Sequence, residues 1–222
     1  MNIKLIGSAT CPFVQRCLIL FALGKVEFEM IYINLINKPD WFLKISPTAK
    51  VPILEIDGSH IFESLVINEF INEKFNLNLQ TSNPLQKALN KSWSEYSSTL
   101  ISSLYALICA TDKDNYESLI NRLTAGLNWI ENSEIKLPYF NGDEISLIDI
   151  AFAPLFFRFN ILNENYSTNF FIGTPKIKKW AANLLEHEII RHTTPSNYNN
   201  LINTNILNKQ GLLTSTSRLN KS

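Results

Sequence analysis

The chain has 222 residues, a formal net charge of zero at neutral pH and a hydrophobic content of 45%. A chain of this length can bury about 70% of its unfolded surface and form two compact domains, and its balanced charge gives no support to binding of nucleic acid or of a membrane surface. Three cysteines are too few for a disulfide framework and match no zinc-binding spacing, so we expect a reduced protein without a metal.

The sequence shows no targeting or membrane-spanning pattern. The apolar start, residues 1–7, is too short and too soon interrupted to be a signal peptide. No apolar run reaches the roughly 18 residues that a membrane-spanning helix needs. We therefore expect a cytoplasmic protein with no membrane partner.

The first elements predict a βαβ unit. Residues 2–7 alternate as a buried strand, residues 12–23 carry a helical apolar pattern that ends at Gly24, and residues 28–35 are rich in the residues that favour strands. Two strands joined by a helix are expected to be parallel, with a right-handed crossover.

The next segment predicts a short helix, a hairpin and a longer helix. Residues 39–43 suit a short irregular helix. Residues 52–56 and 59–62 flank Asp57-Gly58, a strong hairpin signal. A further helix is expected to begin with Ser64 as its N-cap and to run to about residue 75.

The element order β-α-β-α-β-β-α is that of a thioredoxin-like domain, which we assign to residues 1–77. Residues 77–85 are polar, contain Pro84 and lack periodicity, so they predict a linker.

The rest of the chain predicts an all-helical domain over residues 86–200. Helical patterns cover residues 85–110 and 116–130, an almost wholly apolar stretch covers 151–159, and another helix is expected from Pro175 to about residue 185. From Pro195 onward the sequence is polar and irregular. We expect a flexible tail over residues 201–222.

Cys11 is the strongest candidate for chemistry. It stands between the first strand and the first helix, where free backbone N–H groups and the positive end of the helix dipole stabilise a thiolate. Pro12 suits the first helical position. This setting favours a cysteine pKa lowered from about 8.5 into the range of about 3.5–7.5. Cys17 and Cys109, in contrast, have the apolar neighbours of cysteines that are simply buried.

Four motifs in order then resemble the glutathione transferase superfamily, specifically its omega-class and related cysteine-type members. They are Cys11-Pro12-Phe13-Val14-Gln15-Arg16 with residues 33–42, Lys50-Val51-Pro52-Ile53-Leu54, Phe62-Glu63-Ser64, and the capping-box sequence Ser146-Leu147-Ile148-Asp149. The resemblance covers roughly residues 1–190. It implies the two-domain glutathione transferase fold, with glutathione as co-substrate and no metal.

The resemblance also implies a binding site. A cis bond before Pro52 would let the Val51 backbone pair with the cysteinyl part of glutathione, as an added strand does. Ser64 would bind the γ-glutamyl carboxylate and Glu63 its ammonium group. The implied set is completed by Lys38 or Lys50 for the glycyl carboxylate and by Phe13 beside the sulfur. Taken singly, Ser64 could be only a helix cap, and either lysine only a solvated surface residue.

The implied mechanism is glutathione-dependent thiol transfer, including deglutathionylation and dehydroascorbate reduction. Cys11 would form a mixed disulfide with glutathione, and a second glutathione would release it. Val14 occupies the position of a resolving cysteine, and Cys17 points off the face of Cys11, so the route is monothiol. An oxidised or electrophilic second substrate would bind between the domains, against the helix that carries Trp93, Tyr96 and Tyr105.

Two alternatives remain open at this point: conventional conjugation of glutathione to electrophiles, and a non-enzymatic binding protein of the stringent starvation protein A type. A homodimer is expected by analogy alone. His60, His187 and His192 are interpreted as structural or surface residues.

Overall fold

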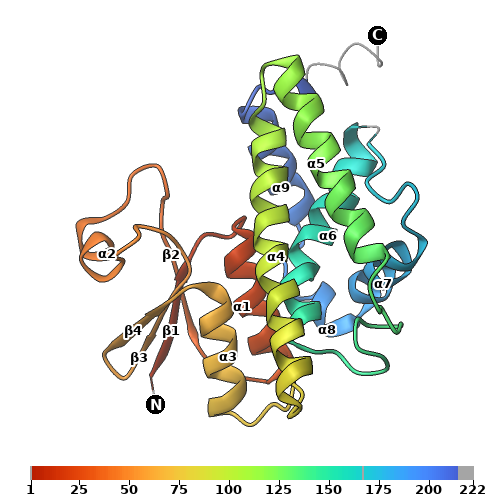
Figure 1. Cartoon of the computed structure of the whole chain (residues 1–222). Helices are drawn as coiled ribbons and strands as arrows, with labels where there is room; N and C mark the ends of the chain where they lie inside the picture. Colours follow the sequence, from red (N-terminus) through yellow and green to blue (C-terminus); the bar gives the residue numbers. More distant parts are fainter. Residues whose placement is uncertain (1, 167, 215–222) are drawn as a thin grey trace.

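The computed structural model describes residues 2–166 and 168–214 (Figure 1). Its first part is a four-stranded sheet with three helices. In chain order these elements are β1 (Ile3–Gly7), α1 (Pro12–Leu23), β2 (Glu29–Tyr32), α2 (Asp40–Ile45), β3 (Ile53–Ile56), β4 (Ser59–Phe62) and α3 (Ser64–Lys74). The predicted order β-α-β-α-β-β-α is confirmed.

The sheet is mixed, with strand order β2-β1-β3-β4. β1 pairs parallel to β2, as the βαβ pattern predicts, and antiparallel to β3. The hairpin between β3 and β4 turns at Asp57-Gly58, where both residues have a positive φ, of 47° and 82°. Such a pair of left-handed residues is what a two-residue hairpin turn requires, and glycine adopts this conformation without strain.

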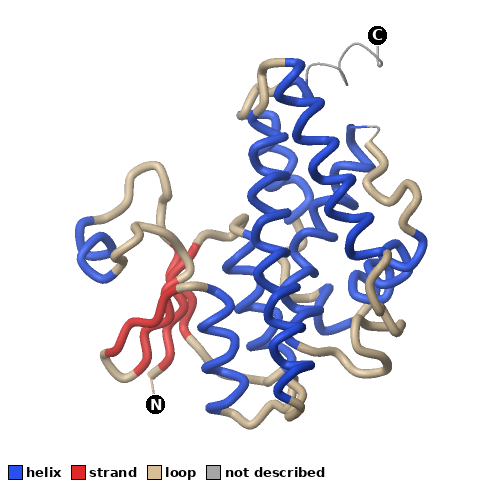
Figure 2. Tube along the Cα trace, viewed as in Figure 1, coloured by secondary structure: helices blue, strands red, loops and turns tan. Residues whose placement is uncertain are grey.

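The helices of this first part lie on opposite sides of the sheet (Figure 2). α1 and α3 lie between the sheet and the remaining helices, whereas α2 lies on the far side, on the loop that joins β2 to β3 (Figure 1). Both faces of α1 are therefore covered, and seven of its residues are buried.

The second part of the described chain is helical. Its elements are α4 (Pro84–Cys109), α5 (Lys113–Glu131), α6 (Leu147–Tyr166), α7 (Pro175–Glu186), α8 (Glu188–Arg191) and α9 (Tyr198–Asn208). α6 is buried along most of its length and packs against α1, α4 and α7, so it forms the centre of this domain. Within the described residues, no helix is long and apolar enough to cross a membrane.

The capping sequence at the start of α6 forms a buried hydrogen-bond network around Asp149. Its carboxylate accepts bonds from the backbone N–H and hydroxyl of Ser146, at 2.8 and 2.7 Å. It also accepts from the backbone N–H of Phe140 at 2.9 Å and from the indole N–H of Trp180 at 2.7 Å. Burial raises the pKa of Asp149, although all four bonds favour its carboxylate. Asp149 thus joins the turn, α6 and α7.

The predicted irregular tail is wrong in its first part. α9 spans Tyr198–Asn208, and Tyr198, Ile202 and Ile206 are buried against the rest of the domain, as is Leu213 beyond the helix. These apolar residues recur at the spacing of one helix face, but the polar residues between them conceal the pattern. The remainder of the predicted tail, residues 215–222, lies outside the described residues. The proposed domain boundaries themselves stay a prediction.

Two local predictions also need correction. The second strand is shorter than expected, at Glu29–Tyr32. Gly24 ends α1 as predicted, but with an ordinary φ of −81°, and Lys25 adopts the left-handed conformation instead, at 50°. A Cβ atom at Gly24 would lie 2.6 Å from a terminal methyl carbon of Leu77, so the Leu77 side chain would have to move to admit a larger residue.

Candidate functional site

Cys11 is the N-cap residue of α1, directly after the sheet, as the sequence predicts. Its backbone is extended (φ −75°, ψ 124°), Pro12 is the first helical residue, and the Cys11 N–H donates to the carbonyl of Ser8 at 3.1 Å. The backbone N–H groups of Phe13 and Val14 interact with the sulfur. Cys11 forms no disulfide, and the residue as a whole is partly exposed. It therefore combines access with helix-terminus donors.

The expected lowering of the Cys11 pKa is wrong for the protein without a ligand. Burial raises the pKa of this thiol, and this effect exceeds the opposing influence of the Val14 and Phe13 N–H groups and of the positive charges of Arg158 and Arg16. The sequence indicates the helix terminus but not the side chains that cover it. In the free protein, Cys11 is predominantly a thiol at neutral pH.

The Val51-Pro52 bond is cis, which confirms the expectation from the sequence. Val51 is buried, and its carbonyl oxygen lies 3.9 Å from the Cys11 sulfur, close enough to accept a weak hydrogen bond from the thiol. The backbone immediately before β3 thus lies against the start of α1, although 40 residues separate the two in the sequence.

Ser64 is the first residue of α3, not its N-cap as predicted. The N-cap position belongs to Glu63, which is exposed and has a positive φ of 66°. The Ser64 side chain is buried, and its oxygen accepts a hydrogen bond from Nη1 of Arg16 at 3.1 Å. This bond leaves the Ser64 hydroxyl hydrogen available to an acceptor outside the helix.

The two candidate lysines lie on the long connection between β2 and β3. Lys38 is partly buried just before α2, and Lys50 is exposed directly before Val51. In the described part of the chain, neither ammonium group forms a salt bridge. Phe13 is partly buried in the first turn of α1, and the guanidinium of Arg16 lies 5.0 Å from its ring centroid.

Sequence reasoning assigned no role to Arg16, yet this residue connects four elements. Its side chain is fully buried and donates to the hydroxyl groups of Ser64, Ser97 and Ser98 and to the carbonyl of Ala151, at 2.8–3.1 Å. Burial lowers the pKa of Arg16 to about 10. Its position among the apolar residues of α1 was the available signal, because a charge on a buried helix face needs several partners.

A second buried network was also missed. Arg158, on α6, donates to the carbonyl of Thr10 at 2.7 Å and to the side-chain oxygen of Gln15 at 3.0 Å. The Tyr198 hydroxyl donates to the same Gln15 oxygen at 2.8 Å, and the Asn205 amide donates to the Thr10 hydroxyl at 2.9 Å. α6 and α9 therefore hold the segment on either side of Cys11. The lone arginine in the otherwise apolar stretch 151–159 was the signal.

Cys17 and the histidines agree with their structural interpretation, whereas Cys109, which was expected to be buried, is partly exposed. Cys17 is fully buried, its thiol faces the carbonyl of Phe13 at 3.7 Å, and burial raises its pKa strongly. His60 lies beside Glu55, and His187 caps α8. Among the described residues, no group of three or more His, Cys, Asp or Glu side chains could hold a metal ion.

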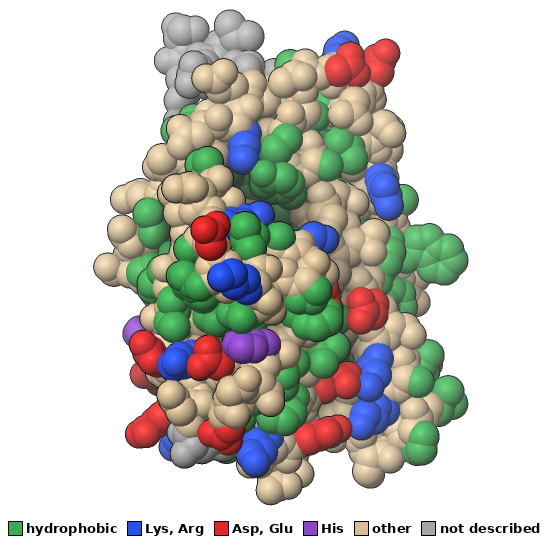
Figure 3. Space-filling model, turned by 90° about the vertical axis from the view of Figure 1, so that its left-hand side faces the viewer, with side chains coloured by type: hydrophobic (Ala, Val, Ile, Leu, Met, Phe, Trp, Pro, Cys, Tyr) green, Lys and Arg blue, Asp and Glu red, His purple; other side chains and the backbone are tan. Residues whose placement is uncertain are grey.

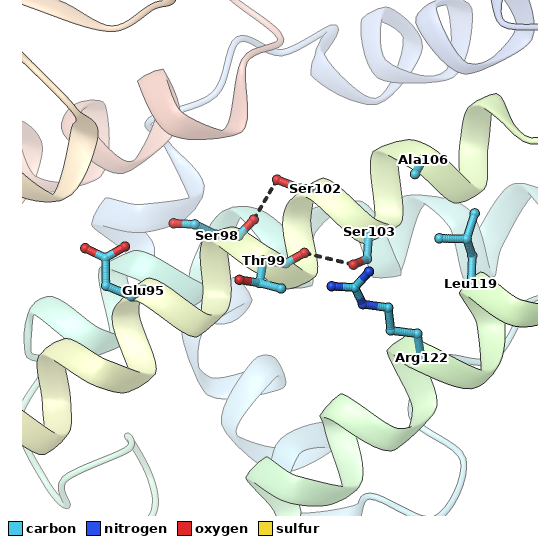
Figure 4. A pocket seen from close by; sticks show the side chains of 8 residues that line it. All are labelled: Glu95, Ser98, Thr99, Ser102, Ser103, Ala106, Leu119 and Arg122. Carbon is cyan, nitrogen blue, oxygen red and sulfur yellow. Dashed lines mark hydrogen bonds between the residues drawn. The ribbon is translucent and has the colours of Figure 1, made fainter.

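A surface hollow that Cys11 does not line lies between α4 and α5 (Figure 4). It measures about 420 Å³ and is lined mainly by polar side chains. The hydroxyls of Ser102 and Ser103 donate to carbonyls of their own helix, and Arg122 extends from α5 toward Ser103. The expected second-substrate pocket stays a prediction. Of its aromatic candidates, Trp93 packs against Tyr96, and Tyr105 is mostly exposed.

The surface carries no concentration of one charge on the face shown in Figure 3. Acidic and basic side chains alternate there with hydrophobic ones. This face includes the sheet side of the molecule, and its mixed charge agrees with the net charge of zero.

Comparison with known proteins gives matches along most of the chain. The model of the glutathione S-transferase N-terminal domain matches residues 10–74, and that of the C-terminal domain matches residues 95–188. Glutathione S-transferase omega-1 of Rattus norvegicus is 30% identical over 192 residues, which are 85% of this chain and 78% of that protein. Probable glutathione S-transferase DHAR1, cytosolic, of Oryza sativa subsp. japonica is 32% identical over 159 residues, 70% of each chain.

The crystal structure of glutathione transferase Omega 3C from Trametes versicolor has the same fold. It superposes with a TM-score of 0.79 at 26% sequence identity, over 88% of this chain and 90% of that one. The mixed sheet and the helical second part described above are thus those of this fold.

Proposed function

Because the chain belongs to the glutathione S-transferase family, we propose that it is a glutathione-dependent thiol transferase whose nucleophile is Cys11. The observation that carries this proposal is Cys11 itself, a free and partly exposed residue at the first turn of α1. A cysteine there can form a disulfide with glutathione, which the hydroxyl of a serine or tyrosine cannot do. Relatives that are named omega-1 and DHAR1 support the same subclass.

The reaction is a pair of thiol–disulfide exchanges. The Cys11 thiolate attacks the glutathione sulfur of a mixed disulfide, a Cys11–glutathione disulfide forms, and the substrate leaves as a thiolate that takes up a proton. The thiolate of a second glutathione then attacks the glutathione sulfur bound to Cys11. Oxidised glutathione leaves and the Cys11 thiolate is restored. With dehydroascorbate, two glutathione molecules supply the two electrons and two protons.

The thiol contact with Val51 suggests how glutathione binds. In the free protein the Cys11 thiol lies against the Val51 carbonyl. Once Cys11 loses its proton, this carbonyl has no donor, and it can accept the cysteinyl N–H of glutathione in the manner of an added strand. The bound tripeptide would thereby bring its sulfur beside Cys11 and Phe13.

The ends of the tripeptide would be held by charged and hydroxyl groups. The Ser64 hydroxyl, whose oxygen already accepts from Arg16, would donate to the γ-glutamyl carboxylate. The exposed Glu63 carboxylate would bind the ammonium group of the same residue. Lys38 or Lys50 would bind the glycyl carboxylate, and neither has a salt-bridge partner in the described residues.

The structure supports a route with one cysteine. Val14 occupies the position of a resolving thiol and is buried, as is Cys17. Disulfide exchange requires an accessible sulfur. Val14 has none and that of Cys17 is buried, so neither residue can release the glutathione bound to Cys11. A second glutathione is therefore needed for turnover.

The test of the nucleophile is the Cys11→Ser variant with a small glutathione mixed disulfide as substrate. We expect turnover to fall by at least about 1,000-fold, because the hydroxyl cannot form the intermediate. Cys109→Ser is the matched control and should keep the parent rate. Undiminished turnover in Cys11→Ser would overturn the proposed mechanism.

Two further assays on the same purified proteins distinguish the two alternative functions. Conjugation to an aromatic halide without disulfide exchange would favour a conventional transferase. Retention on immobilised glutathione with neither reaction would favour a binding protein. The accessible cysteine argues against both, because neither needs a thiol at this position.

We also propose that the protein is a cytoplasmic homodimer. The three cysteines are free, as is usual in a reducing compartment. Exposed apolar side chains occur on β4, α3 and α4, at Phe62, Val66 and Leu89. Single exposed apolar residues are ordinary, but three on adjacent elements suit a contact between subunits.

A further inference from the structure

Arg158 is a buried cation close to the candidate nucleophile but in the other part of the fold. Its side chain is 7% exposed and donates to three neutral oxygens: the carbonyls of Thr10 and Pro154 and the side-chain oxygen of Gln15. Within residues 2–166 and 168–214, it forms no salt bridge. A buried charge without a counter-ion is costly, so the guanidinium would favour an anion that forms close to it.

The hydrogen bonds of Arg158 converge on the loop that carries Cys11. The 2.7 Å bond to Thr10 fixes the residue directly before Cys11, and the 3.0 Å bond to Gln15 fixes the helix one turn after it. Tyr198 supports Gln15 from α9. Because both ends of this short segment are held, the thiol has a defined position relative to the guanidinium.

The groups that act electrostatically on Cys11 come from three elements. Arg16 and Cys17 belong to α1, Arg158 to α6 and Tyr198 to α9. Cys17 and Tyr198 are buried and neutral at physiological pH, since burial raises the pKa of both. The two arginines are therefore the charges that favour a Cys11 thiolate, and both lower the pKa of its thiol.

The two arginines donate hydrogen bonds to different parts of the molecule. Arg16 directs its donors to Ser64, Ser97 and Ser98 and to the Ala151 carbonyl. Arg158 directs its donors to the segment on both sides of Cys11. The counter-ion that suits Arg158 is thus the thiolate that the reaction itself generates.

We propose that Arg158 is a positioning residue for the proposed thiol transfer: it holds the Cys11 loop and supplies the positive charge that stabilises the Cys11 thiolate. This inference rests on the proposed function for its biological meaning. It assigns a role in the chemistry to the helical domain, because the nucleophile lies on α1 and its cation on α6.

The test is the rate at which iodoacetamide alkylates Cys11, followed by mass spectrometry of the Cys11 peptide as a function of pH. In this reaction the thiolate attacks the CH₂ carbon and iodide leaves. Arg158→Gln should raise the midpoint of the profile by about one pH unit and slow alkylation about tenfold at any fixed pH below the midpoint. Arg158→Lys keeps the charge and should restore most of the parent rate.

A second variant keeps the proposal testable if Arg158→Gln fails to fold. The Gln15 amide nitrogen is buried without a hydrogen-bond partner, so Gln15→Glu sacrifices no hydrogen bond and places a carboxylate oxygen against Arg158. Neutralising the guanidinium in this way should also raise the midpoint. Arg122→Gln, in the hollow between α4 and α5, is the control and should leave the profile unchanged.

The inference is overturned if neither Arg158→Gln nor Gln15→Glu raises the midpoint, or if Arg158→Lys raises it as much as Arg158→Gln. Thermal unfolding of each variant distinguishes a loss of packing from a loss of charge. A loss of packing lowers the melting temperature without moving the midpoint of the alkylation profile. Alkylation requires no glutathione. A wild-type protein that fails to exchange disulfides would refute the proposed function, but the alkylation profiles would still test the role of Arg158.

Discussion

At Cys11, electrostatic contacts and burial shift the pKa of the thiol in opposite directions. The helix terminus and two arginines favour the thiolate, whereas burial favours the thiol and prevails in the free protein. The thiol also faces the Val51 carbonyl, which accepts a hydrogen bond only from the protonated form. Glutathione binding would remove that contact, so we expect the thiolate to form chiefly in the complex.

This balance predicts a pH profile for the wild-type protein. A raised pKa means a smaller thiolate fraction at neutral pH, so alkylation of Cys11 by iodoacetamide should keep increasing through the ordinary cysteine range, near pH 8.5, and level off only above it. Mass spectrometry of the Cys11 peptide across pH measures this directly. A plateau already reached below about pH 7 would contradict the structure's description of this thiol.

At the scale of the elements, α9 changes the expected layout most. The helix buries one apolar face and also delivers Tyr198 and Asn205 to the segment around Cys11. A part of the chain that the sequence assigns to a tail is therefore next to the candidate nucleophile.

Two adjacent residues of α9 provide a matched test. Ile206 is 4% exposed and its neighbour Leu207 is 36% exposed. Ile206→Ala should reduce the free energy of unfolding by about 2–4 kcal/mol, because it leaves a cavity, whereas Leu207→Ala should cost well under half as much. Urea unfolding of both variants gives the comparison. Equal effects would mean that α9 is not packed as described.

At the scale of the whole molecule, two buried arginines join the sheet domain to the helices. Arg16 reaches from α1 to α4 and α6, and Arg158 reaches from α6 back to the loop before α1. Neither arginine forms a salt bridge within the described residues, so each relies on carbonyl and hydroxyl oxygens alone. Such bonds depend on exact placement, and the two domains consequently constrain one another.

The homodimer is a prediction at this scale as well. Sedimentation equilibrium should give about twice the 25.4 kDa mass of one chain. Val66, which is 53% exposed and lines the hollow between α3 and α4, is the residue to change. Val66→Glu should shift the protein toward monomer, because it places a charge in an apolar contact. Glu117→Gln on α5 serves as the control. A monomeric wild-type protein would refute the dimer.

By itself, the sequence determined the element order of the first domain, the hairpin turn and the place of Cys11 at a helix start. These features depend on residues close together in the chain, such as Pro12 after Cys11 or Asp57 before Gly58, whose preferences are local. The helical character of the second domain followed for the same reason, from apolar periodicity.

Only the tertiary structure decided what surrounds the thiol. Arg158 and Tyr198 lie 147 and 187 residues from Cys11 in the chain, and no local pattern indicates that they bond to the residues around it. Whether Cys11 is a thiol or a thiolate depends on burial and on charges brought from these distant segments. The sequence thus identified the candidate nucleophile, while its burial and the charges brought by the fold influence its ionisation.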